Sequence, residues 1–280
     1  MNVLIRVWDR VAGVQPAPPA WVVAVAGLAA LAIVANTRSW RLAGKVITIA
    51  HEGGHALVSV LSGRRLEGIR LHSDGSGVTY SRGRRTGPAM VACAAAGYTA
   101  PSLLGAGAAA LLATRHVTAM LWLALVLLAA TLLAIRNAFG VIAVLATAGA
   151  TFAVSYFASA AVQAGFGYLA AWFLLFGALR PVAELQRGRR RGRGRGRGQG
   201  RGRADGSDAE QLARLTGVPG GIWVTFFAFV ALCMLGVGVW LLVPTGWHAQ
   251  PTRSRRSRGS HVDRIHGAPL SSHDSHILNI

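Results

Sequence analysis

Charged side chains are scarce in this sequence, and acidic ones are the scarcest. Of the 280 residues 14% are charged, and only 10 are Asp or Glu, whereas soluble domains carry about 25% charged residues. Hydrophobic residues make up 52% of the chain. This balance is far from that of a soluble enzyme and favours a protein whose surroundings are largely lipid.

Cysteine is also rare. Cys93 and Cys233 both fall inside apolar runs, where small buried thiols are common and disulfide pairing is not required. Residues 1–20 lack a clear apolar core and contain three prolines, so we expect no cleavable signal peptide there. The first apolar run would then act as an uncleaved insertion signal.

Long apolar runs dominate the remainder of the chain. A transmembrane helix needs about 20 mostly apolar residues, and short connections between such runs favour antiparallel neighbours. Seven runs approach this length, at 21–35, 40–61, 88–113, 117–135, 138–157, 160–179 and 222–243. They predict an all-α membrane protein, built as a polytopic bundle of about six to seven transmembrane helices.

Positive charge gathers outside these runs. The formal net charge is +19, and nine arginines lie between Arg187 and Arg203. Residues 187–206 alternate mainly Arg and Gly, which cannot form a core, so we expect a disordered loop there. The Arg187 to Arg203 stretch is suited to anionic lipid headgroups, and its lack of interleaved aromatic residues argues against nucleic acid.

The basic loops also suggest a topology, because such loops tend to stay in the cytoplasm. A cytoplasmic N-terminus places the basic segments 64–85 and 187–203 in the cytoplasm and the tail outside. We divide the chain into an N-terminal polar segment 1–20, a membrane domain 21–243 and a disordered basic tail 244–280. We expect a multi-pass protein of the bacterial cell membrane.

One connection carries β-sheet signals. Leu66, Ile69 and Leu71 are spaced as on a strand, residues 73–77 (Ser-Asp-Gly-Ser-Gly) form a turn signal, and residues 78–80 are again β-prone. The pattern predicts a short β-hairpin. The alternative is a connecting loop with accidental β propensity.

The run His51-Glu52-Gly53-Gly54-His55 lies near the middle of the second apolar run. Histidines four residues apart share one face of a helix, so both imidazoles can bind one Zn²⁺. Glu52 lies on a neighbouring part of that face, where a carboxylate can take a proton from water as a general base. The glycines remove side chains where a substrate or partner backbone approaches.

The membrane setting makes this short motif informative. An ionisable side chain in the middle of a membrane costs about 2.5 to 3.5 kcal/mol, and this run places three within five positions. The alternative is a polar cluster that only links helices by hydrogen bonds. We favour a metal site.

A catalytic zinc needs a third protein ligand and an open position. The main candidate is Asp208, which follows the helix-capping residue Ser207 ahead of the last apolar run. An acid at the start of a helix can also simply favour the helix dipole. Further candidates are Asp205, Glu210, His72, His116 and Asp74.

Several motifs together resemble the site-2 protease family of intramembrane zinc metalloproteases, specifically its compact branch without a PDZ domain. The similarity covers about residues 45–243. It rests on His51 to His55 followed by Ala56-Leu57 and Gly63, on Gly75-Ser76-Gly77-Val78-Thr79, on Ala96-Gly97-Tyr98, on Arg136-Asn137 and on Ser207-Asp208.

The resemblance implies a function for these residues. His51, His55 and Asp208 would bind Zn²⁺, Glu52 would be the catalytic base, and Val78 to Tyr80 would help to present an unwound substrate helix. Because Asp208 precedes the last apolar run by more than ten residues, its segment must fold back into the bundle. The implied activity is cleavage of a membrane protein substrate.

Two other functions stay open from the sequence. A non-proteolytic transporter or scaffold would use the His and Glu side chains as a polar or metal site. An RNA-tethering protein would use Arg187 to Arg203 and would bind nucleic acid in a salt-sensitive way.

Overall fold

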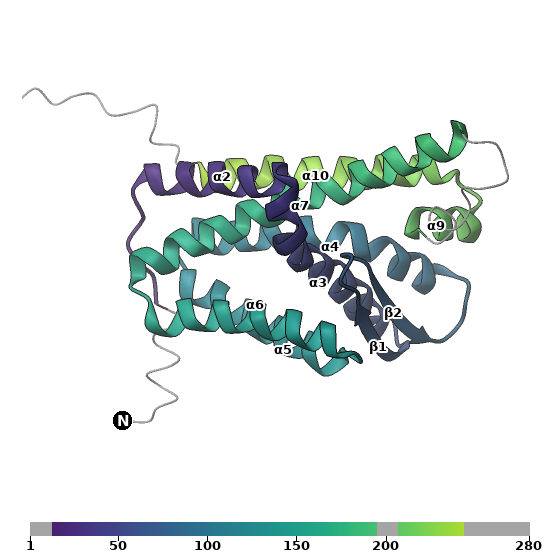
Figure 1. The fold of residues 1–280 in the computed structure, drawn as a ribbon, viewed down its shortest axis with the longest axis horizontal. Coiled ribbons are helices and arrows are strands. Elements are labelled where there is room, and N and C mark those ends of the chain that lie inside the picture. The colour runs from purple at the N-terminus through teal and green to yellow at the C-terminus, as the bar shows by residue number, and fades with distance from the viewer. Residues whose placement is uncertain (1–12, 195–206, 244–280) are drawn as a thin grey trace, which may run out of the picture. The chain divides into compact units, whose positions relative to one another are not determined.

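The computed structural model describes residues 13–194 and 207–243, which form eight helices and one two-stranded sheet (Figure 1). In chain order the elements are α2 (Ala20–Ala35), α3 (Thr37–Leu61), β1 (Arg65–Leu71), β2 (Gly77–Arg82), α4 (Pro88–Ala113), α5 (Val117–Ala134), α6 (Ala138–Phe157), α7 (Ala160–Gly194), α9 (Asp208–Thr216) and α10 (Gly220–Leu242). Segment 1–12 and the tail 244–280 lie outside the described residues.

Five helices are long and apolar enough to cross a membrane: α4, α5, α6, α7 and α10. The count rises to six if α2 and α3 together form one bent span. The predicted class, a mostly helical polytopic protein with one hairpin, is confirmed. The two N-terminal helices, predicted as separate spans, instead form a pair with a bend of 103°.

The bend between α2 and α3 lies at Asn36, which caps the second helix. Its side-chain oxygen accepts hydrogen bonds from the backbone N–H of Arg38 at 2.8 Å and of Ser39 at 3.3 Å. These bonds satisfy donors that a helix start leaves unpaired. The new helix can therefore begin in a different direction, and it carries the HExxH run across the bundle.

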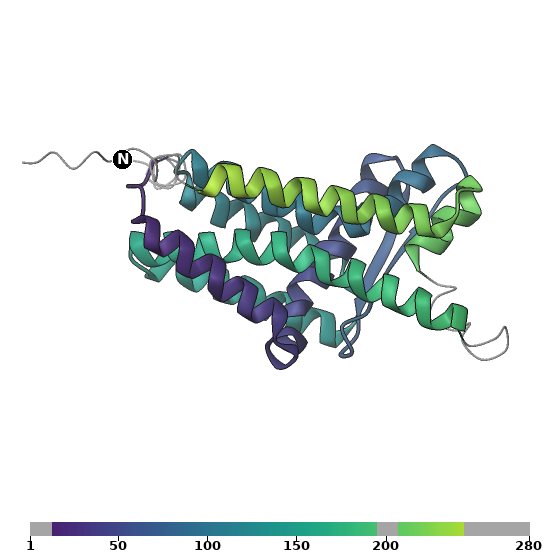
Figure 2. The same cartoon turned by 90° about the horizontal axis from the view of Figure 1, so that it is seen from above.

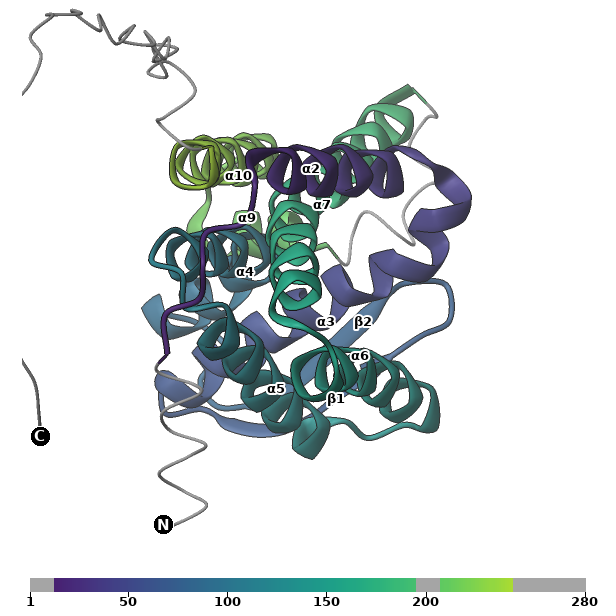
Figure 3. The same cartoon turned by 90° about the vertical axis from the view of Figure 1, so that its left-hand side faces the viewer.

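Helix α7 lies at the centre of the bundle, packed against α2, α4 and α10 (Figures 2 and 3). Small residues allow close helix approach in lipid, and a Cβ at Gly105 of α4 would lie 2.9 Å from Cγ of Leu175 on α7. Trp172 and Leu175 of α7 are among the buried residues of the largest apolar cluster. This cluster fixes the helices that surround the site.

The hairpin follows α3 directly, and its register pairs Ile69 with Thr79 and Leu71 with Gly77. The other edge of β1 meets the α5–α6 connection, where the backbone N–H of Arg136 donates to the Ile69 carbonyl at 2.8 Å. The side-chain amide of Asn137 donates to the Leu71 carbonyl at 2.7 Å and accepts from its N–H at 3.1 Å. The hairpin is therefore held from two sides. Helix α3 packs against both of its strands, and the α5–α6 connection is hydrogen-bonded to β1.

Helix α7 continues to Gly194, well beyond the expected end at 179 and into the segment 187–206 for which a disordered loop was predicted. Arginine is a good helix former, and Arg189 pairs with Glu210 of α9 at 3.1 Å, so both favour a helix longer than the apolar run. The remaining residues 195–206 lie outside the described residues.

Helix α9 folds back against the bundle, as the sequence required for Asp208 to reach the motif. Ala209 and Leu212 are fully buried in a cluster with side chains of α4, α7 and α10, including Val182 and Phe227. Gly217, in the left-handed conformation at φ 73°, ends the helix. This packing holds the start of α9 beside α3 and α4.

Candidate metal centre

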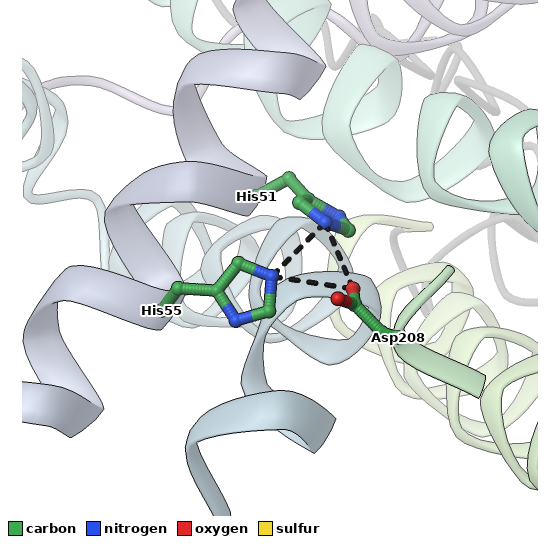
Figure 4. A group of neighbouring side chains, drawn as sticks. All are labelled: His51, His55 and Asp208. Atoms are coloured by element: carbon green, nitrogen blue, oxygen red, sulfur yellow. Dashed lines mark hydrogen bonds and ion pairs between the residues drawn. The ribbon is translucent and has the colours of Figure 1, made fainter. Parts of the chain in front are cut away.

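The two histidines of the HExxH run lie one turn apart on α3 and converge. Nε2 of His51 and Nε2 of His55 are 3.2 Å apart (Figure 4). His55 is 9% exposed, and His51 is half-buried. A helix places side chains at i and i+4 one above the other, so this convergence follows from their spacing.

Asp208, the first residue of α9, completes a group of three. Its Oδ2 atom lies 3.1 Å from Nε2 of His51 and 3.2 Å from Nε2 of His55. Zinc ligands at 2.0 to 2.1 Å in a tetrahedron are about 3.3 to 3.4 Å apart. The three atoms therefore have close to the separations that one zinc ion requires. Among the residues that the structure describes, they form the one such cluster of His, Cys, Asp or Glu.

The second nitrogen of His55 is also engaged. Nδ1 lies 2.7 Å from the backbone carbonyl oxygen of Cys93 on α4, and a carbonyl can only accept, so Nδ1 carries the hydrogen. When the ring is neutral, Nε2 then presents its lone pair to the cluster. This is the outer bond that orients metal-binding histidines in proteins.

Helix α4 leaves room for the cluster because residue 97 has no side chain. A Cβ at Gly97 would lie 2.3 Å from Nε2 of His55 and 2.6 Å from Nε2 of His51. A Cβ at Gly54 would lie 2.4 Å from Cβ of Ala100, so Gly54 lets α3 approach α4. Gly53, by contrast, has only the hydroxyl oxygen of Thr131 nearby, at 3.6 Å.

Aromatic side chains cover one side of the cluster. The Tyr98 ring meets the His51 ring edge-on at a centroid distance of 4.8 Å, and it stacks on Phe227 of α10 at 4.9 Å. Aromatic pairs of this kind contribute about 0.5 to 1.5 kcal/mol beyond their buried area. These contacts hold the His51 ring in position.

Glu52 points toward the hairpin, not toward solvent. It is 4% exposed, and its Oε2 atom accepts a hydrogen bond of 2.6 Å from the Thr79 hydroxyl of β2. The backbone of Gly77 lies so close that a Cβ there would be 2.6 Å from Cγ and Oε1 of Glu52. Strand β2 therefore covers and orients this carboxylate.

The carboxyl group of Asp208 is held in its ionised form. Burial acts to raise the pKa of its carboxyl group, but hydrogen bonds and positive charge from His51 and His55 outweigh burial and hold the pKa well below the usual range. Metal ligands of this type must be deprotonated. The carboxylate therefore needs no change in protonation to act as a ligand.

The other candidate ligands lie elsewhere. Glu210 pairs with Arg189, and the carboxylate of Asp74 accepts hydrogen bonds from Ser76 in the exposed hairpin turn. His72 is exposed in the same turn, and Nδ1 of His116 lies 3.0 Å from the Thr114 hydroxyl before α5. Asp205 lies outside the described residues.

A comparison with protein-family models bears on this arrangement. A model described as Peptidase M50B-like matches residues 24–238. The chain belongs to the Peptidase M50B-like family. This is the site-2 protease family, so the predicted membership is confirmed, and the family consists of membrane metallopeptidases. Neither the curated proteins nor the solved structures provide a significant match.

Two contacts of this M50B-like chain escaped the sequence analysis. Val78 to Tyr80 were expected to help to present a substrate, and the hydrogen bond from the Thr79 hydroxyl to Glu52 was not predicted. The Cys93 contact with His55 uses a backbone carbonyl, which leaves no side-chain signal. The roles of Gly97 and Asn137 also went unassigned, although both lie in motifs that carried the family resemblance.

Proposed function

We propose that this chain is a zinc-dependent intramembrane endopeptidase that cleaves membrane-embedded protein substrates. The observation that carries the proposal is the convergence of three ligand atoms, separated by 3.1 to 3.2 Å, beside the buried Glu52. In this proposal His51, His55 and Asp208 hold the zinc ion. Three protein ligands leave a position open, as in catalytic zinc sites.

The chemistry needs a proton carrier next to the metal. Zinc supplies Lewis acidity, which polarises a peptide carbonyl and makes water more acidic. Glu52 takes a proton from the water oxygen as that oxygen attacks the carbonyl carbon. It then gives the proton to the amide nitrogen as the C–N bond breaks. The Thr79 hydroxyl holds the carboxylate in place for both transfers.

The hairpin supports an extended substrate. Val78 and Tyr80 of β2 are 41% and 46% exposed, while Thr79 between them faces Glu52. Alternate side chains of a strand point to opposite faces, so Val78 and Tyr80 form an apolar surface on the face of β2 that points away from Glu52. A substrate helix that unwinds here would expose its peptide bonds to the centre.

The test is the Glu52→Gln variant in liposomes, with a panel of single-span peptides as substrates and mass spectrometry to detect products. We expect cleavage to fall below detection while zinc content stays near that of the wild type, because Gln keeps the shape but cannot carry the proton. The matched control is Glu184→Gln, a half-exposed carboxylate on α7 paired with Arg180. It should cleave normally.

Two outcomes would count against this function. Full activity of the Glu52→Gln chain would remove Glu52 as the base. Zinc bound by the wild type without cleavage of any membrane peptide would favour a transporter or scaffold with a metal site.

A further inference from the structure

A basic cleft lies among the hairpin, the start of α4 and the second half of α9. It has a volume of about 530 Å³ and is lined by Arg64, Ser81, Arg85, Met90, Gln211, Arg214 and Leu215. Three separate chain segments contribute its arginines, and none of the lining residues that the structure describes is acidic. Three arginines therefore line one cleft.

Arg64 is held in a fixed conformation at this cleft. Its Nε donates to the Ser81 hydroxyl at 3.2 Å, and Nη1 donates to the Arg84 carbonyl. A guanidinium has five N–H donors, so these bonds leave donors for a ligand. An arginine that is ordered in advance loses less conformational entropy on binding.

The position of the cleft relative to the spans points to its ligand. Arg85 comes three residues before the span that begins at Pro88, and Arg214 comes six residues before the span that begins at Gly220. The cleft therefore lies where two helices enter the membrane, at the level of lipid headgroups. Arginine binds phosphate oxygens through paired N–H bonds.

We propose that this cleft binds a phosphate group, either that of an anionic lipid headgroup or a free phosphate. The site differs from the Arg187 to Arg203 stretch, whose described side chains, at 187–190, do not line it.

Occupancy of the cleft has a consequence for the metal centre. Gln211 and Leu215 lie three and seven residues after Asp208 on α9, so all three share one side of the helix. A bound phosphate restrains this helix and thereby the position of the Asp208 carboxylate. That consequence rests on the proposed function, whereas phosphate binding itself does not.

The experiment uses the full chain without added zinc, so that failure of the peptidase assignment cannot affect it. In a detergent with a neutral headgroup, inorganic phosphate is titrated by calorimetry. In nanodiscs, native mass spectrometry compares the amount of phosphatidylglycerol that the chain retains with the amount of phosphatidylcholine. The variant is Arg85→Gln with Arg214→Gln, because both residues are exposed. If the double variant does not fold, the single variant Arg85→Gln is measured in its place.

The matched control is Arg38→Gln with Arg41→Gln, which removes the same charge from exposed positions at the start of α3. We expect the cleft variant to bind at least about tenfold more weakly than the control. If the cleft variant binds more weakly in both arms, the cleft recognises the phosphate group itself. Weaker binding in the lipid arm alone identifies a lipid headgroup as the ligand. Weaker binding in the calorimetric arm alone identifies a soluble phosphate. Equal binding by the cleft variant and the control in both arms overturns the proposal.

Discussion

The Thr79 hydroxyl lies 2.6 Å from Oε2 of Glu52 and 3.2 Å from the Glu52 backbone oxygen. The two residues come from different elements, since Glu52 is on α3 and Thr79 is on β2. The hairpin is therefore part of the catalytic arrangement that we propose, and it is joined to the general base by a direct hydrogen bond. Its position should matter for the rate of the reaction as well as for substrate binding.

Removal of this hydrogen bond should slow cleavage. A hydrogen bond to a charged group contributes about 1.5 to 3 kcal/mol, which corresponds to about a 10- to 100-fold fall in rate. We expect Thr79→Val to lower kcat by this factor while KM and zinc content change little. Thr79→Ser, which keeps the hydroxyl, should recover most of the activity. Equal rates for the Val variant and the wild type would show that Thr79 has no positioning role.

Added volume at residue 97 should displace the metal ligands. A Cβ at Gly97 would lie 2.3 Å from Nε2 of His55, closer than any relaxed contact permits. We expect Gly97→Ala to lose most bound zinc, measured by metal analysis of the purified chain. Gly107→Ala is the matched control, because it is on the same helix and its Cβ would meet nothing within 4 Å. Normal zinc content in both variants would contradict the placement of α4.

Local patterns of the sequence predict much of this site. The four-residue spacing of His51 and His55 predicts a shared face from helix geometry alone, and α3 presents them in this way. The spacing of Leu66, Ile69 and Leu71 with a following turn likewise predicts the hairpin. Each of these predictions depends on residues that are close in the chain.

Contacts between distant segments are harder to predict. The approach of Asp208 depends on burial of Ala209 and Leu212 against side chains of α4, α7 and α10. The Thr79 contact depends on which face of the hairpin meets α3. Apolar periodicity indicates that a residue is buried but not which element buries it. Hydropathy likewise indicates that a helix is apolar but not its direction, so it did not predict the bend at Asn36.

The link between Asn137 and β1 should stabilise the hairpin. Its amide satisfies both the N–H and the carbonyl of Leu71, a residue that is 3% exposed. A buried polar group without a partner costs about 1 to 3 kcal/mol. We expect Asn137→Ala to lower the free energy of local opening by this amount, seen as faster hydrogen exchange in β1. Thr147→Ala, which removes a bond within α6, should leave β1 exchange unchanged.

Zinc should stabilise the chain through Asp208. A ligand that binds only the folded state at 100 times its Kd adds about 2.7 kcal/mol to the free energy of unfolding. Loss of an outer partner of a metal ligand costs about 10- to 100-fold in affinity, so loss of the ligand itself, in Asp208→Asn, should cost at least about 100-fold. At the same zinc concentration the stabilisation of the Asp208→Asn variant by zinc then falls to about 0.4 kcal/mol.

The measurement for this prediction is the shift in Tm on addition of zinc, with a chelator to define the metal-free value. Glu210→Gln is the comparison, because it removes an acid two residues away that pairs with Arg189 at 3.1 Å. That pair is partly exposed and contributes about 1 kcal/mol or less, so α9 should stay folded and the zinc-induced shift should remain. If Glu210→Gln abolished the shift and Asp208→Asn retained it, the third ligand would be Glu210.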